Sequence, residues 1–115
     1  ANLLARNGCG AMTAAISPYA AVRDECRQMC EATFVEVYVE APLEVVEERD
    51  TKGLYKKARS GEIKNFTGVS DPYEAPTNAE IEVHTGTESI EESTSKILAY
   101  LEEKGLVAKA GATAN

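Results

Sequence analysis

A concentration of positive charge between residues 52 and 64 is the part of this sequence best suited to chemistry. The segment has one acidic residue, Glu62, and five basic residues: Lys52, Lys56, Lys57, Arg59 and Lys64. Its net charge is +4, whereas the 115-residue chain carries −7 and the remainder therefore −11. Because lysine and arginine make charge-assisted hydrogen bonds to phosphate and sulfate, the segment favours a site for a multiply charged small anion. A solvated charged loop accounts for the charge alone equally well.

The cysteines and the single histidine give weaker patterns. Cys9, Cys26 and Cys30 are odd in number and lack the paired spacing with histidines of a zinc site, so we expect buried or partly buried free thiols. Cys26 and Cys30 are four residues apart in a helical stretch, which leaves a regulatory disulfide as an alternative. His84 falls in an alternating segment and is expected to be a strand side chain, not a metal ligand or general base.

Composition limits the class of protein. The length fits one domain, and a pI near 4.7 argues against binding to nucleic acid or to a membrane surface. The sequence has no apolar run approaching the roughly 18 residues of a membrane span, and its first residues lack a signal-peptide pattern. We therefore expect a cytoplasmic protein.

The elements that would position the basic segment follow from apolar periodicity. Strands are predicted over 11–16, 34–39 and 79–85, and helices over 20–30, 43–49 and 89–104. The last helix has the strongest signals: a capping box of Ser89 and Glu92, a stop at Lys104 and Gly105, and an apolar stripe of Ile90, Ile97, Leu98 and Leu101. Residues 52–68 have no sustained period and predict a surface loop or lid, and residues 108–115 predict a disordered tail. Strands alternating with helices indicate an α/β fold with a parallel sheet.

Several motifs resemble those of one enzyme family. The run from Arg49 through Lys-Gly-Leu-Tyr-Lys-Lys-Ala-Arg (52–59) and Gly-Glu-Ile-Lys (61–64) to Phe-Thr-Gly (66–68) resembles the lid of adenylylsulfate kinases. Ile-Ser-Pro-Tyr (16–19) with Arg23 and Asp24 is similar to the substrate loop of that family, and Asp-Pro-Tyr-Glu-Ala-Pro (71–76) resembles its segment after the lid. The resemblance implies a P-loop NTPase-like α/β fold, of which only the last three strands and their helices are present. Residues 1–107 would be the C-terminal portion of the kinase domain, with the lid at about 50–70.

The resemblance also implies an activity and a set of binding residues. Members of the family transfer the γ-phosphate of ATP to the 3′-hydroxyl of adenosine 5′-phosphosulfate (adenylylsulfate), with Mg²⁺. Substrate binding is implied for Ile16, Ser17, Lys52, Asn65 and Phe66, and ATP binding for Lys56, Lys57, Arg59, Glu88 and Ser93. Phe66 would stack on the substrate adenine. Asn65 stands where many members have glycine, which leaves a backbone contact at that position.

Ser17 admits two interpretations. In some bacterial members the matching serine is linked to a phosphorylated form, whereas a serine before Pro18 is also an ordinary turn residue. We expect substrate contact and no obligatory phosphoserine relay. No residue of the chain is predicted to bind metal.

The phosphate-binding turn of a P-loop enzyme is missing from the sequence. No Gly-x-x-x-x-Gly-Lys-Ser/Thr occurs, and the nearest glycine cluster, at positions 8 and 10, is not followed by lysine. The resemblance implies that the acidic base of the family also lies upstream in complete members. We therefore expect a chain that begins in mid-domain, whose partner is the missing N-terminal half and which is inactive alone. The intact protein would be a homo-oligomeric kinase, either separate or fused to ATP sulfurylase. The alternative is a truncated, non-catalytic nucleotide-binding or structural module that keeps the lid.

Overall fold

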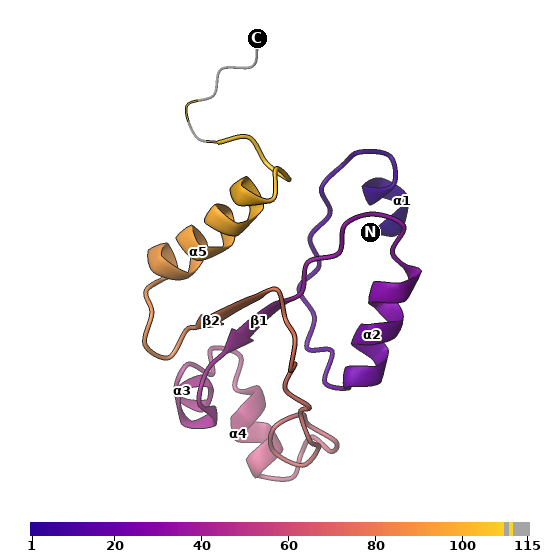
Figure 1. The fold of residues 1–115 in the computed structure, drawn as a ribbon. Helices are drawn as coiled ribbons and strands as arrows, with labels where there is room; N and C mark the ends of the chain where they lie inside the picture. Colours follow the sequence, from indigo (N-terminus) through magenta and orange to yellow (C-terminus); the bar gives the residue numbers. More distant parts are fainter. Residues whose placement is uncertain (110, 112–115) are drawn as a thin grey trace.

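Two parallel strands lie at the centre of the computed structural model, which describes residues 1–109 and 111 (Figure 1). Strand β1 (Val37–Glu40) pairs with β2 (Ile81–His84) in the register Val37 with Ile81 through Glu40 with His84. Ile81 and Val83 alternate with exposed neighbours and are 7% and 1% exposed. The alternating apolar pattern therefore produces the expected buried face, and the α/β class is confirmed.

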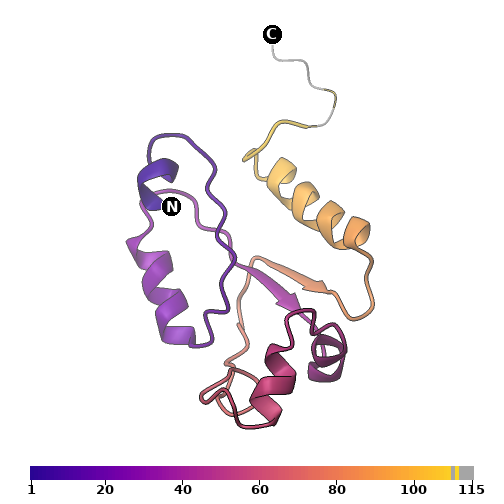
Figure 2. The ribbon, with the colours of Figure 1, turned by 180° about the vertical axis from the view of Figure 1, so that it is seen from behind.

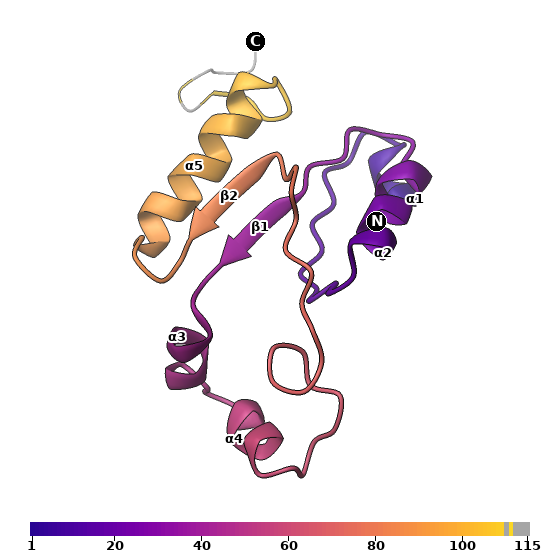
Figure 3. The same cartoon turned by 60° about the horizontal axis from the view of Figure 1, so that its bottom comes forward.

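Five helices surround these strands within the described residues: α1 (Asn2–Ala5), α2 (Ala20–Met29), α3 (Leu43–Glu48), α4 (Leu54–Arg59) and α5 (Ile90–Glu103). Helix α5 packs beside β2, whereas α3 follows the carboxyl end of β1 and leads to α4 (Figure 3). Seen from behind, α1 and α2 form a separate group away from α5 (Figure 2). The predicted helices over 20–30, 43–49 and 89–104 are confirmed as α2, α3 and α5, each slightly shorter.

Helix α5 begins with the predicted capping box. The Ser89 hydroxyl accepts a hydrogen bond from the Glu92 amide at 3.1 Å, and the Glu92 carboxylate accepts one from the Ser89 amide at 2.7 Å. These two bonds satisfy amide groups that the first turn of a helix leaves without partners. The apolar stripe is only partly correct, because Ile90 is 82% and Leu98 49% exposed.

Two predictions of secondary structure are wrong. Residues 11–16 form no strand, and the structure has two strands among its described residues where three were expected. Half of that segment is alanine, which has low β-propensity, and Met12 is 96% exposed. The segment 52–68, predicted as a loop, contains α4. The carboxylate of Asp50 accepts hydrogen bonds from the amides of Leu54 (2.8 Å) and Lys56 (3.1 Å), which stabilises a helix too short to show an apolar period.

Little apolar surface is buried. In the described part of the chain, the buried hydrophobic residues are Ala58, Ile81 and Val83. The radius of gyration is 16.8 Å, compared with about 13 Å expected for a compact domain of this length. The thiols follow the same trend, because Cys9 and Cys26 are exposed and only Cys30 is partly covered. All three are free, so the expected burial of the thiols is wrong for two of them. None of the helices formed by residues 1–109 is long and apolar enough to span a membrane.

The two loops that leave the sheet touch at one glycine. A Cβ atom at Gly86 would lie 2.8 Å from Cδ of Pro42, which is closer than van der Waals contact permits. Gly86→Ala should therefore lower the free energy of unfolding by about 1–3 kcal/mol, because the proline ring or the loop has to shift. Urea unfolding of a protein that contains the chain measures this loss.

Gly10→Ala is the matched control, since a Cβ there meets no heavy atom within 4 Å. Equal unfolding free energies for the two variants would show that the Pro42 ring moves aside without loss.

Candidate functional site

The predicted lid, residues 50–70, presents three of its five basic side chains from α4. Lys56, Lys57 and Arg59 lie in the last turn of α4, where cations are favoured by the negative end of the helix dipole. Gly53 starts the helix with φ +66°, a left-handed conformation that glycine adopts without steric cost. The lysines of the lid are exposed.

The basic side chains of α4 differ in their partners. Nη2 of Arg59 lies 2.6 Å from Oε1 of Glu47, on α3, and its Nε donates to the same oxygen at 2.7 Å. No ion pair of Lys56 or Lys57 is found among residues 1–109. The two lysines are therefore available to an anion in this conformation, whereas Arg59 is engaged.

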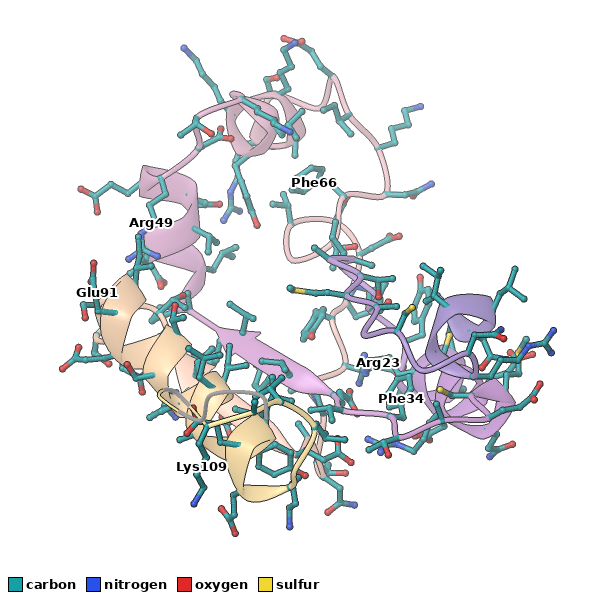
Figure 4. The ribbon with its side chains drawn as sticks, turned by 90° about the horizontal axis from the view of Figure 1, so that it is seen from above. Arg23, Phe34, Arg49, Phe66, Glu91 and Lys109 are labelled. Atoms are coloured by element: carbon teal, nitrogen blue, oxygen red, sulfur yellow. The ribbon has the colours of Figure 1, made fainter. Side chains whose placement is uncertain are left out.

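A tight turn after α4 fixes Asn65 and Phe66. The Phe66 carbonyl accepts hydrogen bonds from the amides of Ser70 (2.9 Å) and Asp71 (3.0 Å), and the Phe66 amide donates to the Ser70 hydroxyl at 2.7 Å. Asn65 has φ +54°, which explains why this position suits glycine and asparagine. The Phe66 ring lies on the inner side of the arc made by α3, α4 and the following loop (Figure 4). It meets the Tyr55 ring edge-on, with centroids 5.0 Å apart.

The predicted substrate loop lies beside the segment that follows the lid. Ile16 is 66% exposed, and Ser17 has φ +42°, an uncommon conformation for a residue other than glycine. The Pro18 carbonyl accepts a hydrogen bond from the amide of Glu74 at 2.8 Å. The structure therefore brings together two of the motifs found in the sequence, 16–19 and 71–76.

Arg23, Arg27, Glu36 and Glu80, here called the ion cluster, join α2 to the amino ends of both strands. Arg27 donates hydrogen bonds to Glu80 (2.9 Å) and Glu36 (3.2 Å), and Glu80 accepts a further one from the Glu36 amide at 2.7 Å. Nε of Arg23 lies 3.0 Å from the Glu36 carboxylate, and both side chains are at most 15% exposed. Hydrogen bonding from Arg27 lowers the pKa of Glu80, and hydrogen bonding to Glu80 raises that of Arg27.

A cleft of about 470 Å³ lies against the ion cluster and is also lined by residues 75–78. Its charged lining adds Asp24 to the two arginines and two glutamates of the cluster. Positive charge does not exceed negative charge there, so the cleft is unsuited to a polyanion. The lid is the better candidate.

Glu88 and Ser93 lie at the start of α5, beyond the carboxyl end of β2. Ser93 is 8% exposed, and its hydroxyl donates to the Glu88 carboxylate at 2.9 Å. Lys96 pairs with the same carboxylate. The hydrogen bond from Lys96 lowers the pKa of Glu88. Arg49 donates to the Thr85 carbonyl at 2.7 Å and so ties this edge to α3. The structure thus places Glu88 and Ser93 in contact with each other, with side chains that are already engaged.

His84 occupies β2, as expected, and its Nδ1 lies 3.1 Å from the Glu40 carboxylate on the neighbouring strand. No group of three or more histidine, cysteine, aspartate or glutamate side chains able to hold a metal ion occurs in the described part of the chain.

Three residues with clear structural roles were missed as site residues from the sequence: Arg23, Asp50 and Glu74. Each belongs to a motif, but each acts largely on backbone atoms, which a motif does not reveal. For Asp50, the local signal in the sequence was its position four residues before Leu54, within reach of the first amides of α4.

Comparison with known proteins defines the class and then the family. An APS kinase of Mycobacterium tuberculosis, solved in complex with AMPPNP and APS, aligns with a TM-score of 0.70 and 40% identity, covering 76% of this chain and 52% of that one. The fold is thus that of the P-loop NTPases to which the APS kinases belong. The adenylylsulphate kinase family model matches residues 1–84. The chain belongs to the adenylylsulphate kinase family.

Curated relatives agree with this assignment. The adenylyl-sulfate kinase of Rippkaea orientalis is 61% identical over 95% of this chain and 60% of its own length. A probable bifunctional SAT/APS kinase of Sorangium cellulosum is 60% identical over 97% of this chain and 19% of its own length. The chain therefore spans about 60% of the single-function relative.

The lowered pKa of Glu80 makes the ion cluster sensitive to acid. The group stabilises the fold above its unfolded pKa of about 4.3, and this stability is lost as the pH falls through the lower pKa of the folded state. Glu80→Gln should cost about 1–2 kcal/mol of unfolding free energy at pH 7, and the difference should shrink below about pH 4. A suitable host is a chimera in which this chain replaces the region that it matches in the Rippkaea orientalis kinase.

Urea unfolding of the chimera at pH 7 and at lower pH measures the difference. Glu31→Gln is the control, because that carboxylate is 61% exposed and its contact with Arg6 is long, at 3.5 Å. Loss of its charge should change the free energy of unfolding by less than about 0.5 kcal/mol. A Glu80 difference that is constant with pH would contradict the assignment.

Proposed function

We propose that this chain supplies the lid and the substrate loop of an enzyme that phosphorylates adenylylsulfate at its 3′-hydroxyl with ATP. In this reaction the hydroxyl oxygen loses its proton and forms a bond to the γ-phosphorus of ATP as the bond to the bridging oxygen breaks, which yields 3′-phosphoadenylylsulfate, ADP and a proton. The proposal rests chiefly on the family match over residues 1–84, which includes the lid and the substrate loop. The ligands named for the Mycobacterium tuberculosis enzyme, APS and an ATP analogue, support it.

The ATP phosphates are the proposed ligands of the lid. Lys56 and Lys57 are exposed and project from the last turn of α4, so each can donate to phosphate oxygens when the lid covers the nucleotide. Arg59 reaches the phosphates only if it leaves Glu47, from which it is separated by 2.6 Å. We therefore assign the first contact to the lysines and a later contact to Arg59.

Adenylylsulfate is the proposed ligand of the turn after α4 and of the substrate loop. The ring of Phe66 stacks on the adenine, Asn65 contributes through its backbone, and Lys52 contributes charge. Ile16 and Ser17 contact the same nucleotide from the substrate loop. The exposure of Ile16 and the tight turn at Phe66 support this assignment, because an apolar side chain and a fixed ring are then presented to a flat purine.

Glu88 and Ser93 are proposed to lie near the ATP base without binding it directly. The Glu88 carboxylate is already engaged by the Ser93 hydroxyl and by Lys96. Their contribution would be to shape the loop at the carboxyl end of β2, where open α/β sheets bind ligands.

Mg²⁺ is implied by the family, but the described residues of this chain do not fit a metal site. No step is therefore assigned to a metal held by this chain. The same holds for the phosphate-binding turn, because the sequence has no Gly-x-x-x-x-Gly-Lys-Ser/Thr. What these residues can do is orient both nucleotides, supply positive charge to the transferring phosphoryl group and exclude water.

A second candidate function is a nucleotide-binding or structural module without catalysis. Such a module would keep the lid and lose the transfer. The two functions differ in whether the chain, given the remaining part of a relative, turns over substrate.

Phe66→Ala in the chimera should weaken adenylylsulfate binding by about 1–3 kcal/mol and affect ATP binding less, because a base stacks on the ring. Titration of each nucleotide measures both affinities. Tyr55→Ala is the matched control: it removes the edge contact between the two rings, with centroids 5.0 Å apart, and leaves the proposed stacking surface. If both variants weaken both nucleotides equally, the Phe66 ring acts only in packing the lid.

The 115-residue chain alone should not make 3′-phosphoadenylylsulfate, because a lid cannot replace the amides and lysine of a P-loop. Its exposed apolar side chains and unpaired strand edge should also leave it without a cooperative thermal transition. A transfer assay with radiolabelled ATP, run beside the chimera, tests the first point, and circular dichroism melting tests the second. Turnover by the chain alone would show that the essential residues lie within it.

A further inference from the structure

Ser17 has a backbone conformation that requires support. Its φ of +42° lies in the left-handed region, which is unfavourable for a residue with a Cβ atom, by about 1–2 kcal/mol. The following Pro18 adds to the strain, because the residue before a proline favours extended conformations with negative φ. Strain of this kind persists only where surrounding contacts hold it, and it is concentrated at functional sites.

The contact that holds Ser17 comes from Arg23. Nη1 of Arg23 donates to the Ser17 carbonyl at 2.6 Å, while Nη2 of the same guanidinium donates to the Glu74 carbonyl at 2.6 Å. The third nitrogen, Nε, lies 3.0 Å from the Glu36 carboxylate. One planar group thus joins the substrate loop, the segment after the lid and the amino end of β1.

Burial makes this arrangement rigid. The Arg23 side chain is 10% exposed, and its guanidinium lies 5.8 Å from the centroid of the Tyr73 ring. Tyr73 in turn stacks on Tyr38 of β1, with centroids 6.2 Å apart and planes inclined by 14°. The guanidinium therefore has one orientation, set from the sheet.

Glu74 completes the connection from the other side. Its amide donates to the Pro18 carbonyl at 2.8 Å, and its carboxylate accepts from the Ala20 amide, at the first turn of α2, at 2.7 Å. Together with the two carbonyl contacts of Arg23, these bonds form what we call the Arg23 clamp. The clamp joins residues more than 50 positions apart in the sequence, on either side of the lid.

We propose that Arg23 is a positioning residue for adenylylsulfate, which fixes the substrate loop relative to the segment that returns from the lid. This inference rests on the proposed function. Arg23 does not itself touch the substrate: it sets the strained backbone of Ser17, so that Ile16 and Ser17 meet a nucleotide whose base lies on Phe66.

Lysine cannot replace arginine in this role. A lysine at position 23 would keep the charge opposite Glu36, but its single ammonium lacks the fork that reaches two carbonyls in fixed directions. Arg23→Lys therefore keeps the positive charge and removes the two carbonyl contacts of the clamp.

Steady-state kinetics of the chimera test the proposal. Arg23→Lys should raise KM for adenylylsulfate about tenfold, the equivalent of one lost charge-assisted hydrogen bond, and leave KM for ATP within about twofold. Arg6→Lys is the matched control, because Arg6 is 49% exposed and has only a 3.5 Å contact with Glu31; it should leave both KM values unchanged. A residue needed only for folding would reduce the active fraction, which lowers kcat and moves neither KM.

A fall in kcat with unchanged KM, equal rises in both KM values, or an Arg23→Lys variant that does not fold would each overturn the inference. Hydrogen exchange without nucleotide gives a second, activity-independent measurement: in Arg23→Lys the amides of Ala20 and Glu74 should both exchange about tenfold faster. If they keep their protection, the clamp does not depend on Arg23 and the inference fails. A parental chimera that makes no 3′-phosphoadenylylsulfate would instead refute the proposed function, and the exchange result would still decide the clamp.

Discussion

The parallel pairing of β1 with β2 is the constraint on which the rest of this structure depends. Parallel strands cannot be joined by a tight turn, so the chain has to leave the sheet after Glu40 and return at Ile81. That connection contains α3, α4 and the whole of the predicted lid. The register is reinforced outside the ladder by Glu80, which accepts a hydrogen bond from the Glu36 amide at 2.7 Å and binds Arg27. The crossover that contains the predicted lid is therefore anchored at both ends by the same short sheet.

Local signals determined which parts of the fold could be predicted. Helix α5 and strand β2 carry their own evidence, a capping box in one and alternation in the other, and both were correct. The strand predicted over 11–16 was wrong, because an apolar run of that length does not show whether a partner strand exists. Helix α4 was not predicted, because its six residues are too few to show an apolar periodicity. In addition, the side chain that stabilises its first turn, that of Asp50, lies outside the helix. No local rule would have joined Arg27 to Glu80, because 53 positions separate them.

The candidate site shows a similar division between motif and geometry. The motifs named side chains that face solvent, such as those of Lys56 and Lys57, and the proposed roles of these residues stay predictions. The structure added contacts that a motif cannot express: Arg59 already paired with Glu47, and Glu88 already engaged by Ser93. Both findings distinguish residues that a family motif treats as equivalent. A charged group that is already paired with a neighbour has to leave that partner before it can bind a ligand, whereas an unpaired one does not.

The left-handed conformation of Asn65 affects how sequence variation in this family is interpreted. With φ at +54°, glycine, asparagine and aspartate are the residues that the backbone tolerates best, whatever contacts the side chain makes. A saturation scan of the lid would thus report strong selection at this position even if nothing bound there. Invariance at position 65 would record the shape of the turn that presents Phe66, and ligand recognition has to be inferred from positions whose backbone leaves the choice of residue free.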